Sequence, residues 1–152
     1  MGNQSHIESI VRGLALRAGH VLLCRDRAGG YCYLPGGHIE PGESAADALR
    51  RELLEETATP VRVGGLLLLQ EHAFRAKREH HELNLILAMH IPARAAVQSA
   101  EDHLEMVWLD AAGIRRGDIR PACLKPWLIK IAKANRLPKP VAAGAWRSDM
   151  TL

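Results

Sequence analysis

Several features that mark other classes of protein are scarce in this chain of 152 residues. The three cysteines, Cys24, Cys32 and Cys123, are an odd number without a C-x-x-C pair, which argues against a disulfide framework and a thiolate zinc site. Apolar runs such as Leu66 to Leu69 are far shorter than the roughly 20 residues of a membrane-spanning helix. The first residues also lack the charged and apolar segments of a signal peptide. We therefore expect a cytoplasmic protein that does not enter a membrane.

Aromatic residues and excess charge are also scarce. Aromatic side chains make up 4% of the chain, and 20 Lys and Arg face 17 Asp and Glu, giving a net charge of +3 and a pI near 9.0. No long basic block is present and few rings are available for stacking bases, so nucleic acid is not an expected partner, although phosphates would not be repelled. The hydrophobic share of 47% suits a single domain, residues 1–152, that buries about 70% of its unfolded surface.

Changes of hydrophobic periodicity along the chain predict an α+β or α/β domain without internal repeats. Strand character is expected in five segments. These are residues 10–25, broken by a turn at Gly19 and His20, then 31–34, 61–72, 81–91 and 105–109, of which 61–72 and 81–91 would form a long hairpin.

Two helices are expected. The first is capped by Ser44 and ends near Thr57, and the second is amphipathic, covers residues 121–135 and has Pro126 in its first turn. The tail, residues 138–152, has no period, so we expect it to be loosely held with one docking contact through Trp146.

Three glutamates of the first helix are spaced so that their side chains lie on one face. Glu52, Glu55 and Glu56 are related by steps of three and four, which places the Cβ atoms of neighbouring pairs roughly 5–6 Å apart. Such like charges repel one another, and carboxylate oxygens favour a hard divalent cation such as Mg²⁺ or Mn²⁺. The alternative interpretation is a solvated acidic face.

The loop before this helix favours the metal interpretation. Three glycines in the segment PGGHIEPGES would let the backbone pass close to a metal ion or a phosphate. Glu43 could close the loop by an ion pair with Arg51 if the loop curls back. His38 in the same loop could touch a phosphate or face water.

Together these residues resemble the signature of the Nudix hydrolase family: a glycine, five residues, Glu, seven residues, then Arg-Glu-aliphatic-x-Glu-Glu-x-Gly-aliphatic. The matching residues are Gly37, Glu43, Arg51, Glu52, Leu53, Glu55 and Glu56. The last two positions depart, with Ala58 in place of the glycine and Thr59 in place of the aliphatic residue. This departure affects how the helix ends and leaves the carboxylates unchanged.

The resemblance implies a Nudix-type α/β/α sandwich around a mixed β-sheet. It implies a hydrolase in which metal-activated water cleaves the pyrophosphate bond of a nucleoside di- or triphosphate derivative, with Mg²⁺ as cofactor and Mn²⁺ as a substitute. Glu52 and Glu56 would be the principal catalytic ligands. The full set carried over is Gly37, Glu52, Glu55 and Glu56 as metal ligands, with Glu43 and Arg51 as structural support.

The family often places a further acidic residue near a late strand, as a ligand or general base. Glu105 resembles that residue, with Glu101 and Glu82 as rivals, and the alternative is a surface carboxylate on a strand edge. Because consecutive residues on a strand point to opposite faces, His80 and His81 are not expected to form a joint site.

The densest basic segment contains Arg75, Lys77 and Arg78, and lies at the tip of the expected hairpin. It could bind a substrate phosphate or be a solvated loop. The ADP-ribose class has a proline where Phe74 and Arg75 stand, and the dinucleoside polyphosphate class a tyrosine near Lys77, so neither class is favoured.

The expected partner is a small-molecule nucleotide diphosphate, and the substrate stays open among nucleoside triphosphates, nucleotide sugars and related diphosphates. A homodimer is compatible with this interpretation. The alternatives are a non-catalytic Nudix domain that binds a nucleotide and regulates a partner, and an RNA-end pyrophosphohydrolase.

Overall fold

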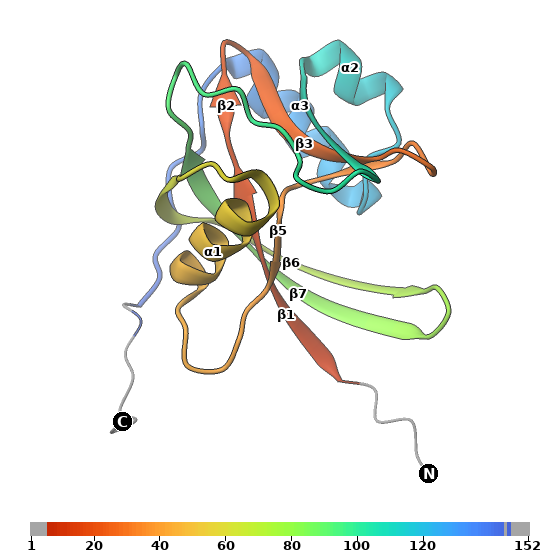
Figure 1. Ribbon diagram of the computed structural model, residues 1–152, viewed down its shortest axis with the longest axis vertical. Helices are drawn as coiled ribbons and strands as arrows, with labels where there is room; N and C mark the ends of the chain where they lie inside the picture. Colours follow the sequence, from red (N-terminus) through yellow and green to blue (C-terminus); the bar gives the residue numbers. More distant parts are fainter. Residues whose placement is uncertain (1–5, 145, 147–152) are drawn as a thin grey trace.

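The computed structural model describes residues 6–144 and 146, which form two four-stranded sheets and three α-helices (Figure 1). The strands are β1 (Ile7–Leu14), β2 (Leu16–Arg17), β3 (His20–Asp26), β4 (Cys32–Tyr33), β5 (Gly36–His38), β6 (Arg62–Arg75), β7 (Glu79–His90) and β8 (Leu104–Leu109). The helices are α1 (Ala45–Thr57), α2 (Ala111–Arg116), the 3₁₀ turn η1 (Ala122–Leu124) and α3 (Lys125–Ala134).

The first sheet has the order β5-β1-β7-β6, and in the second β3 pairs with β2, β4 and β8. Strands β1 and β7 run parallel, whereas the other pairs are antiparallel. The expected mixed α/β fold is therefore confirmed.

Two buried clusters hold the layers together. Leu49 and Leu53 of α1 pack into one cluster with Val11 and Leu22 of the strands. The other cluster contains residues of α2 and α3, which lie next to each other and apart from α1 (Figure 1). Because α1 carries the acidic residues, the first cluster positions the candidate site.

Helix α1 forms where its sequence predicts. The Oγ of Ser44 accepts a hydrogen bond from the backbone N–H of Asp47 at 3.1 Å and so caps the helix. The helix ends at Ala58, which has the left-handed φ of 53° and donates its N–H to the carbonyl of Leu54 at 2.9 Å. Alanine thus adopts the conformation that the family's glycine would allow.

Three local features differ from the sequence-based expectation. Residues Gly36–His38, expected as part of a loop, form strand β5, because their backbone pairs with Ile10–Arg12 of β1. The short helix α2 follows β8 and was not expected. The C-terminal helix is divided into the 3₁₀ turn η1 and α3, with Pro126 in the first turn of α3 as expected.

The tail contacts the molecule through other residues than the one expected. Trp146, the residue expected to dock, is 55% exposed. Instead the N–H of Val141 donates to the carbonyl of Leu66 at 2.8 Å, and Pro140 packs against Gly65 on the edge strand β6. Residues 147–152 of the expected loose tail lie outside the described residues.

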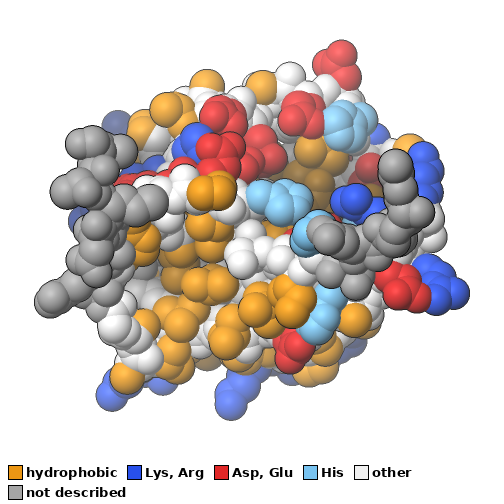
Figure 2. All heavy atoms as spheres, turned by 90° about the horizontal axis from the view of Figure 1, so that it is seen from below, with side chains coloured by type: hydrophobic (Ala, Val, Ile, Leu, Met, Phe, Trp, Pro, Cys, Tyr) orange, Lys and Arg blue, Asp and Glu red, His pale blue; other side chains and the backbone are white. Residues whose placement is uncertain are grey.

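The surface seen in Figure 2 is divided by chemistry. Acidic side chains gather on one side of this face, and apolar side chains cover much of the rest. Among the described residues, no helix has both the length and the apolar character needed to cross a bilayer.

Candidate active site

Gly37 on β5 lies against the side-chain carboxylate of Glu52 on α1. The loop of residues 39–44 connects the two elements. A Cβ atom built on Gly37 would lie 2.3 Å from the carboxyl carbon of Glu52, so a side chain there would displace the carboxylate. Gly36 has a φ of 141°, and its Cβ would lie 2.1 Å from the carbonyl oxygen of Val11. The two glycines therefore allow the backbone of β5 to pass close to an acidic side chain.

Arg51 ties this loop to the helix. Its Nη2 and Nε donate to the two carboxylate oxygens of Glu43 at 2.6 and 3.2 Å, and its Nη2 also donates to the carbonyl of His38 at 3.1 Å. The hydrogen bonds from Arg51 and from the N–H of Glu40 lower the pKa of Glu43. The expected ion pair between Glu43 and Arg51 is thus present, and its bidentate form fixes the loop geometry.

The three glutamates of α1 lie in different surroundings. Glu52 accepts a hydrogen bond from Arg51 at 3.0 Å, while the exposed Glu55 lies 3.5 Å from the same guanidinium. Glu56 is half-buried, and burial, with the charges of Glu52 and Glu101, raises its pKa to about 7. The carboxylate of Glu56 is therefore held in a place where its negative charge lacks full compensation.

The oxygen donors here fit a hard divalent cation. Within residues 6–144 and 146, no three His, Cys, Asp or Glu side chains already surround one point as metal ligands. The charge of Glu52 nevertheless contributes to the raised pKa of Glu56, and a cation between the two carboxylates would offset that repulsion. Carboxylates close to a backbone segment are also the donor set that Mg²⁺ and Mn²⁺ prefer.

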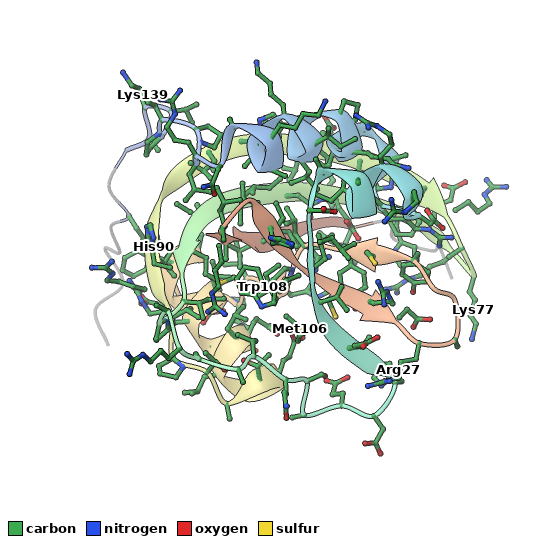
Figure 3. All side chains as sticks on the ribbon, turned by 90° about the horizontal axis from the view of Figure 1, so that it is seen from above. Arg27, Lys77, His90, Met106, Trp108 and Lys139 are labelled. Carbon is green, nitrogen blue, oxygen red and sulfur yellow. The ribbon has the colours of Figure 1, made fainter. Side chains whose placement is uncertain are left out.

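The structure does not bring Glu105 to these carboxylates. Glu105 alternates along β8 with Met106 and Trp108, which pack on the α1 side and are labelled in Figure 3. Its side chain accordingly lies on the other face of the strand, where it pairs with Arg25 at 3.5 Å. Of the rivals, Glu101 lies near enough to Glu56 for its charge to contribute to the raised pKa of Glu56. Glu82 instead accepts a hydrogen bond from Asn84 at 3.2 Å.

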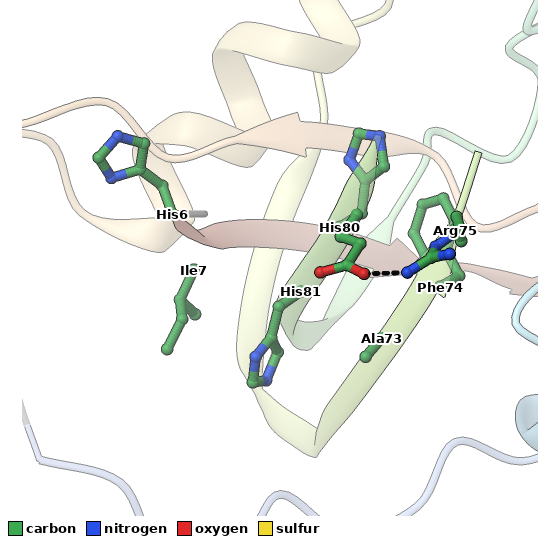
Figure 4. Close-up of a pocket in the computed structure, with 8 residues that line it drawn as sticks. His6, Ile7, Ala73, Phe74, Arg75, His80 and His81 are labelled. Carbon is green, nitrogen blue, oxygen red and sulfur yellow. Dashed lines mark hydrogen bonds and ion pairs between the residues drawn. The ribbon is translucent and has the colours of Figure 1, made fainter. Parts of the chain in front are cut away.

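Two of the three basic side chains at the hairpin tip pair with acidic residues. Arg75 forms an ion pair with Glu79, shown as a dashed line in Figure 4, and Arg78 lies 3.5 Å from Glu8. Lys77 lies at the hairpin end, well away from the yellow ribbon of α1 (Figure 3). Arg75 lines a cavity that Arg12 of β1 also lines.

The three candidate histidines pair with two glutamates. His38 and His80 lie 3.5 and 3.3 Å from Glu8, and His81 lies 2.6 Å from Glu71. His80 and His81 thus pair with different carboxylates. His38 remains 67% exposed, which matches the water-facing alternative for this loop histidine.

A cavity of about 400 Å³ lies between the start of β1 and the hairpin, with His80 and His81 in its lining (Figure 4). A second cavity, of about 580 Å³, is lined by Arg12 of β1, on whose guanidinium the charges of Glu82 and Glu56 act. Both tyrosines of the chain, Tyr31 and Tyr33, and its single phenylalanine, Phe74, line this second cavity. We name it the aromatic cavity.

Sequence reasoning missed Arg12 and the aromatic cavity. A signal for Arg12 was present, since it is the one charged residue in the apolar run from Ile10 to Leu16. No comparable signal marked the aromatic residues, because Tyr33 and Phe74 are far apart in the chain and meet only through the sheets.

Residues 9–128 match the model of the NUDIX domain, and the chain therefore belongs to the Nudix family. It is 27% identical to the CTP pyrophosphohydrolase of Escherichia coli strain K12 over 136 residues, which covers 86% of this chain and 95% of that protein. It is 29% identical over 135 residues to the nucleoside triphosphatase NudI of Escherichia fergusonii, with 80% and 95% of the two chains covered.

A further relative is much longer than this chain. The octanoyltransferase of Myxococcus xanthus is 37% identical over 108 residues, which cover 67% of this chain and only 29% of that protein. Among solved structures, a MutT protein from Methanosarcina mazei Go1 superposes with a TM-score of 0.69 at 21% identity, covering 89% and 99% of the two chains. That structural likeness supports the fold.

Proposed function

We propose that this protein is a divalent-metal-dependent pyrophosphohydrolase of nucleoside triphosphates. The observation that carries the proposal is the contact between Glu52 and Gly37 beside the half-buried Glu56, which gathers poorly compensated oxygen donors. A cavity of about 580 Å³ is lined by Arg12, which donates to the carbonyl of Gly36. Support comes from the two relatives named as a CTP pyrophosphohydrolase and a nucleoside triphosphatase.

The residues of α1 and β5 would hold Mg²⁺, or Mn²⁺ in its place. We assign Glu52 and Glu56 as the principal ligands, with Glu55 and the carbonyl of Gly37 as further ligands. When bound, the cation neutralises the diphosphate charge and lowers the pKa of its water so that the water can attack phosphorus. No covalent intermediate with the protein is required.

The remaining residues position the ligands and the substrate. Arg51 and Glu43 keep the loop against α1, so that Gly37 and Glu52 stay in contact. As the additional ligand or general base we favour Glu101 over Glu105. The charge of Glu101 contributes to the raised pKa of Glu56, whereas Glu105 lies on the face of β8 that is turned away from α1.

The aromatic cavity would take the nucleoside. Rings of Tyr33 and Phe74 offer faces for a base, and a volume of about 580 Å³ is within the ordinary range of small-molecule sites. Arg75 also lines this cavity, so of the three basic hairpin residues it is the one we retain as a substrate contact.

The protein is further proposed to act in a reducing compartment such as the cytoplasm. Cys24, Cys32 and Cys123 are free thiols, and the first two are buried. Their preservation as thiols is expected where disulfides do not persist.

A substrate panel tests this function. Wild-type protein with Mg²⁺ would be incubated with the four ribonucleoside triphosphates, nucleotide sugars and a triphosphate-ended RNA oligonucleotide, and release of phosphate and pyrophosphate would be measured. We expect nucleoside triphosphates to yield nucleoside monophosphate and pyrophosphate. Turnover of the RNA alone would favour the RNA-end activity, and nucleotide binding without any turnover would favour a regulatory domain.

A further inference from the structure

Arg12 of β1 has an unusual set of partners. Its Nη1 donates to the carbonyls of Leu34 and Gly36 at 3.3 and 3.4 Å, and its Nε donates to Oδ1 of Asn84 at 3.4 Å. The guanidinium lies 5.5 Å from the ring centroid of Tyr33. All three acceptors are neutral, and among the described residues Nη2 has no acceptor.

The other cations of the aromatic cavity are already paired. Arg75 forms an ion pair with Glu79, and Arg120 lies 2.9 Å from Asp118 and stacks on Tyr31 at 4.1 Å. In the part of the chain that the structure describes, no carboxylate comes within 4.0 Å of Arg12. Within that part, Arg12 therefore has no carboxylate in direct contact, and it faces this cavity.

A polar network under the cavity holds Arg12 in place. Asn84 is 3% exposed, and its Nδ2 donates to Oε1 of Gln70 at 3.3 Å and to Oε2 of Glu82 at 3.2 Å. With its nitrogen so used, Asn84 directs its oxygen to Arg12. Glu82, which also lines the cavity, accepts this hydrogen bond from Asn84, and its charge acts on Arg12 from beyond ion-pair distance.

Arg12 also lies between the cavity and the carboxylates of α1. It is the register partner of Gly36, which is the neighbour of Gly37, and the charges of Glu82 and, more weakly, Glu56 act on its guanidinium. A nucleotide with its nucleoside beside Tyr33 and its phosphates near Glu56 therefore has its first phosphate beside Arg12.

We propose that Arg12 binds the phosphate group bonded to the nucleoside, with Nη2 as the free donor. The proposal rests on the proposed function, since it takes the substrate to be a nucleotide with its nucleoside in the aromatic cavity. It assigns phosphate binding to a residue of β1 outside the family signature, in addition to Arg75 on the hairpin. An arginine suits this task because its planar fork can donate to the protein and to a phosphate oxygen together.

Binding of nucleoside monophosphates, which are products of the proposed reaction and are not cleaved further, tests the assignment. CMP against cytidine, and GMP against guanosine, would be titrated in Mg²⁺ into wild-type protein and Arg12→Gln by calorimetry. Loss of a charge-assisted hydrogen bond should weaken binding of the monophosphates by about 10- to 100-fold and leave nucleoside binding unchanged. Equal losses for nucleoside and monophosphate, or no preference of the wild type for the monophosphates, would overturn the proposal.

Arg17 supplies a matched control. It too donates to two backbone carbonyls, those of Ala95 and Pro92, and it lies 4.4 Å from the ring of Trp108, but it does not line the aromatic cavity. Arg17→Gln should therefore lower thermal stability about as much as Arg12→Gln while leaving the preference for monophosphates intact. A similar loss of preference in both variants would mean that Arg12 acts through the fold.

A measurement on the wild-type chain covers the case in which Arg12→Gln does not fold. The side-chain NMR signal of Arg12, identified by its absence in Arg12→Lys, should shift on addition of CMP and stay in place with cytidine. An unmoved signal at saturating CMP would contradict the proposal. Hydrolysis of nucleoside triphosphates by the same preparation keeps the proposed function separate, since it can hold while Arg12 is shown not to contact phosphate.

Discussion

At the scale of single residues, Glu56 combines a buried position with negative neighbours. Glu56→Gln keeps the shape of the side chain but replaces an anionic oxygen by an amide, and a change of this kind at a metal ligand should lower activity by at least about 100-fold. Relief of repulsion from Glu52 should hold the stability of the metal-free protein or raise it by a few tenths of a kcal/mol. Turnover at saturating Mg²⁺ and thermal melting in chelator measure the two effects.

The exposed Glu55 is the control for Glu56. Glu55→Gln removes the same charge from the same helix at a position turned toward Arg51, so its effect on turnover should be clearly smaller. Near-normal turnover of Glu56→Gln would remove Glu56 from the site, and melting far below wild type would make it a structural residue.

Gly37 permits a second prediction at this scale. In Gly37→Ala the new methyl group would meet the carboxyl group of Glu52 at 2.3 Å and displace it, so activity should fall by about 10- to 100-fold. Gly144→Ala, where nothing lies within 4 Å of the added atom, should leave activity unchanged. Equal activity of Gly37→Ala and wild type would show that the position of the Glu52 carboxylate is not required.

At the scale of elements, the end of α1 carries a conformational cost. Ala58 adopts φ 53°, which costs a residue with a Cβ roughly 1–2 kcal/mol, whereas glycine adopts it freely. Ala58→Gly should therefore raise the free energy of unfolding by about 0.5–1 kcal/mol, after the greater unfolded-state freedom of glycine is subtracted. Denaturant unfolding measures this free energy. Ala46→Gly, inside the helix, should lower it.

The hairpin β6–β7 offers a test of its basic residues. Arg75→Ala should raise KM with little change in kcat, because Arg75 lines the aromatic cavity and uniform binding affects KM alone. Arg78→Ala and Lys77→Ala should leave KM unchanged, since Arg78 pairs with Glu8 and Lys77 lies at the hairpin end. Steady-state kinetics on the three variants would refute this if their KM values rose together.

At the scale of the whole molecule, activity should depend on a divalent cation and rise on the alkaline side of neutrality, because metal-bound water must lose a proton before it attacks. Mg²⁺ should also raise the melting temperature of the wild type, since a ligand that binds only the folded state stabilises it, and this increase should be reduced in Glu56→Gln. Full turnover in excess chelator would contradict the prediction.

The elements that the sequence predicted are those with a local cause. Helix α1 follows from the Ser44 cap and its helix-forming residues, and the hairpin from two apolar runs around a charged turn. Strand β5 could not be read from the residues Gly36–His38, since only the pairing with β1 makes a strand of them. The face on which Glu105 lies depended likewise on the register of β8 against β3.

Spacing along one helix was enough to place Glu52, Glu55 and Glu56 near one another, because residues three and four apart on a helix are neighbours whatever the rest of the chain does. Charge pairing between distant segments has no such local rule. The sheets bring Glu8 to Arg78 of the hairpin, leave Arg12 facing the aromatic cavity, and gather Tyr33 and Phe74 around it. The composition of the chain could not reveal these contacts, because each joins residues that only the packing of β1, β4, β6 and β7 brings together.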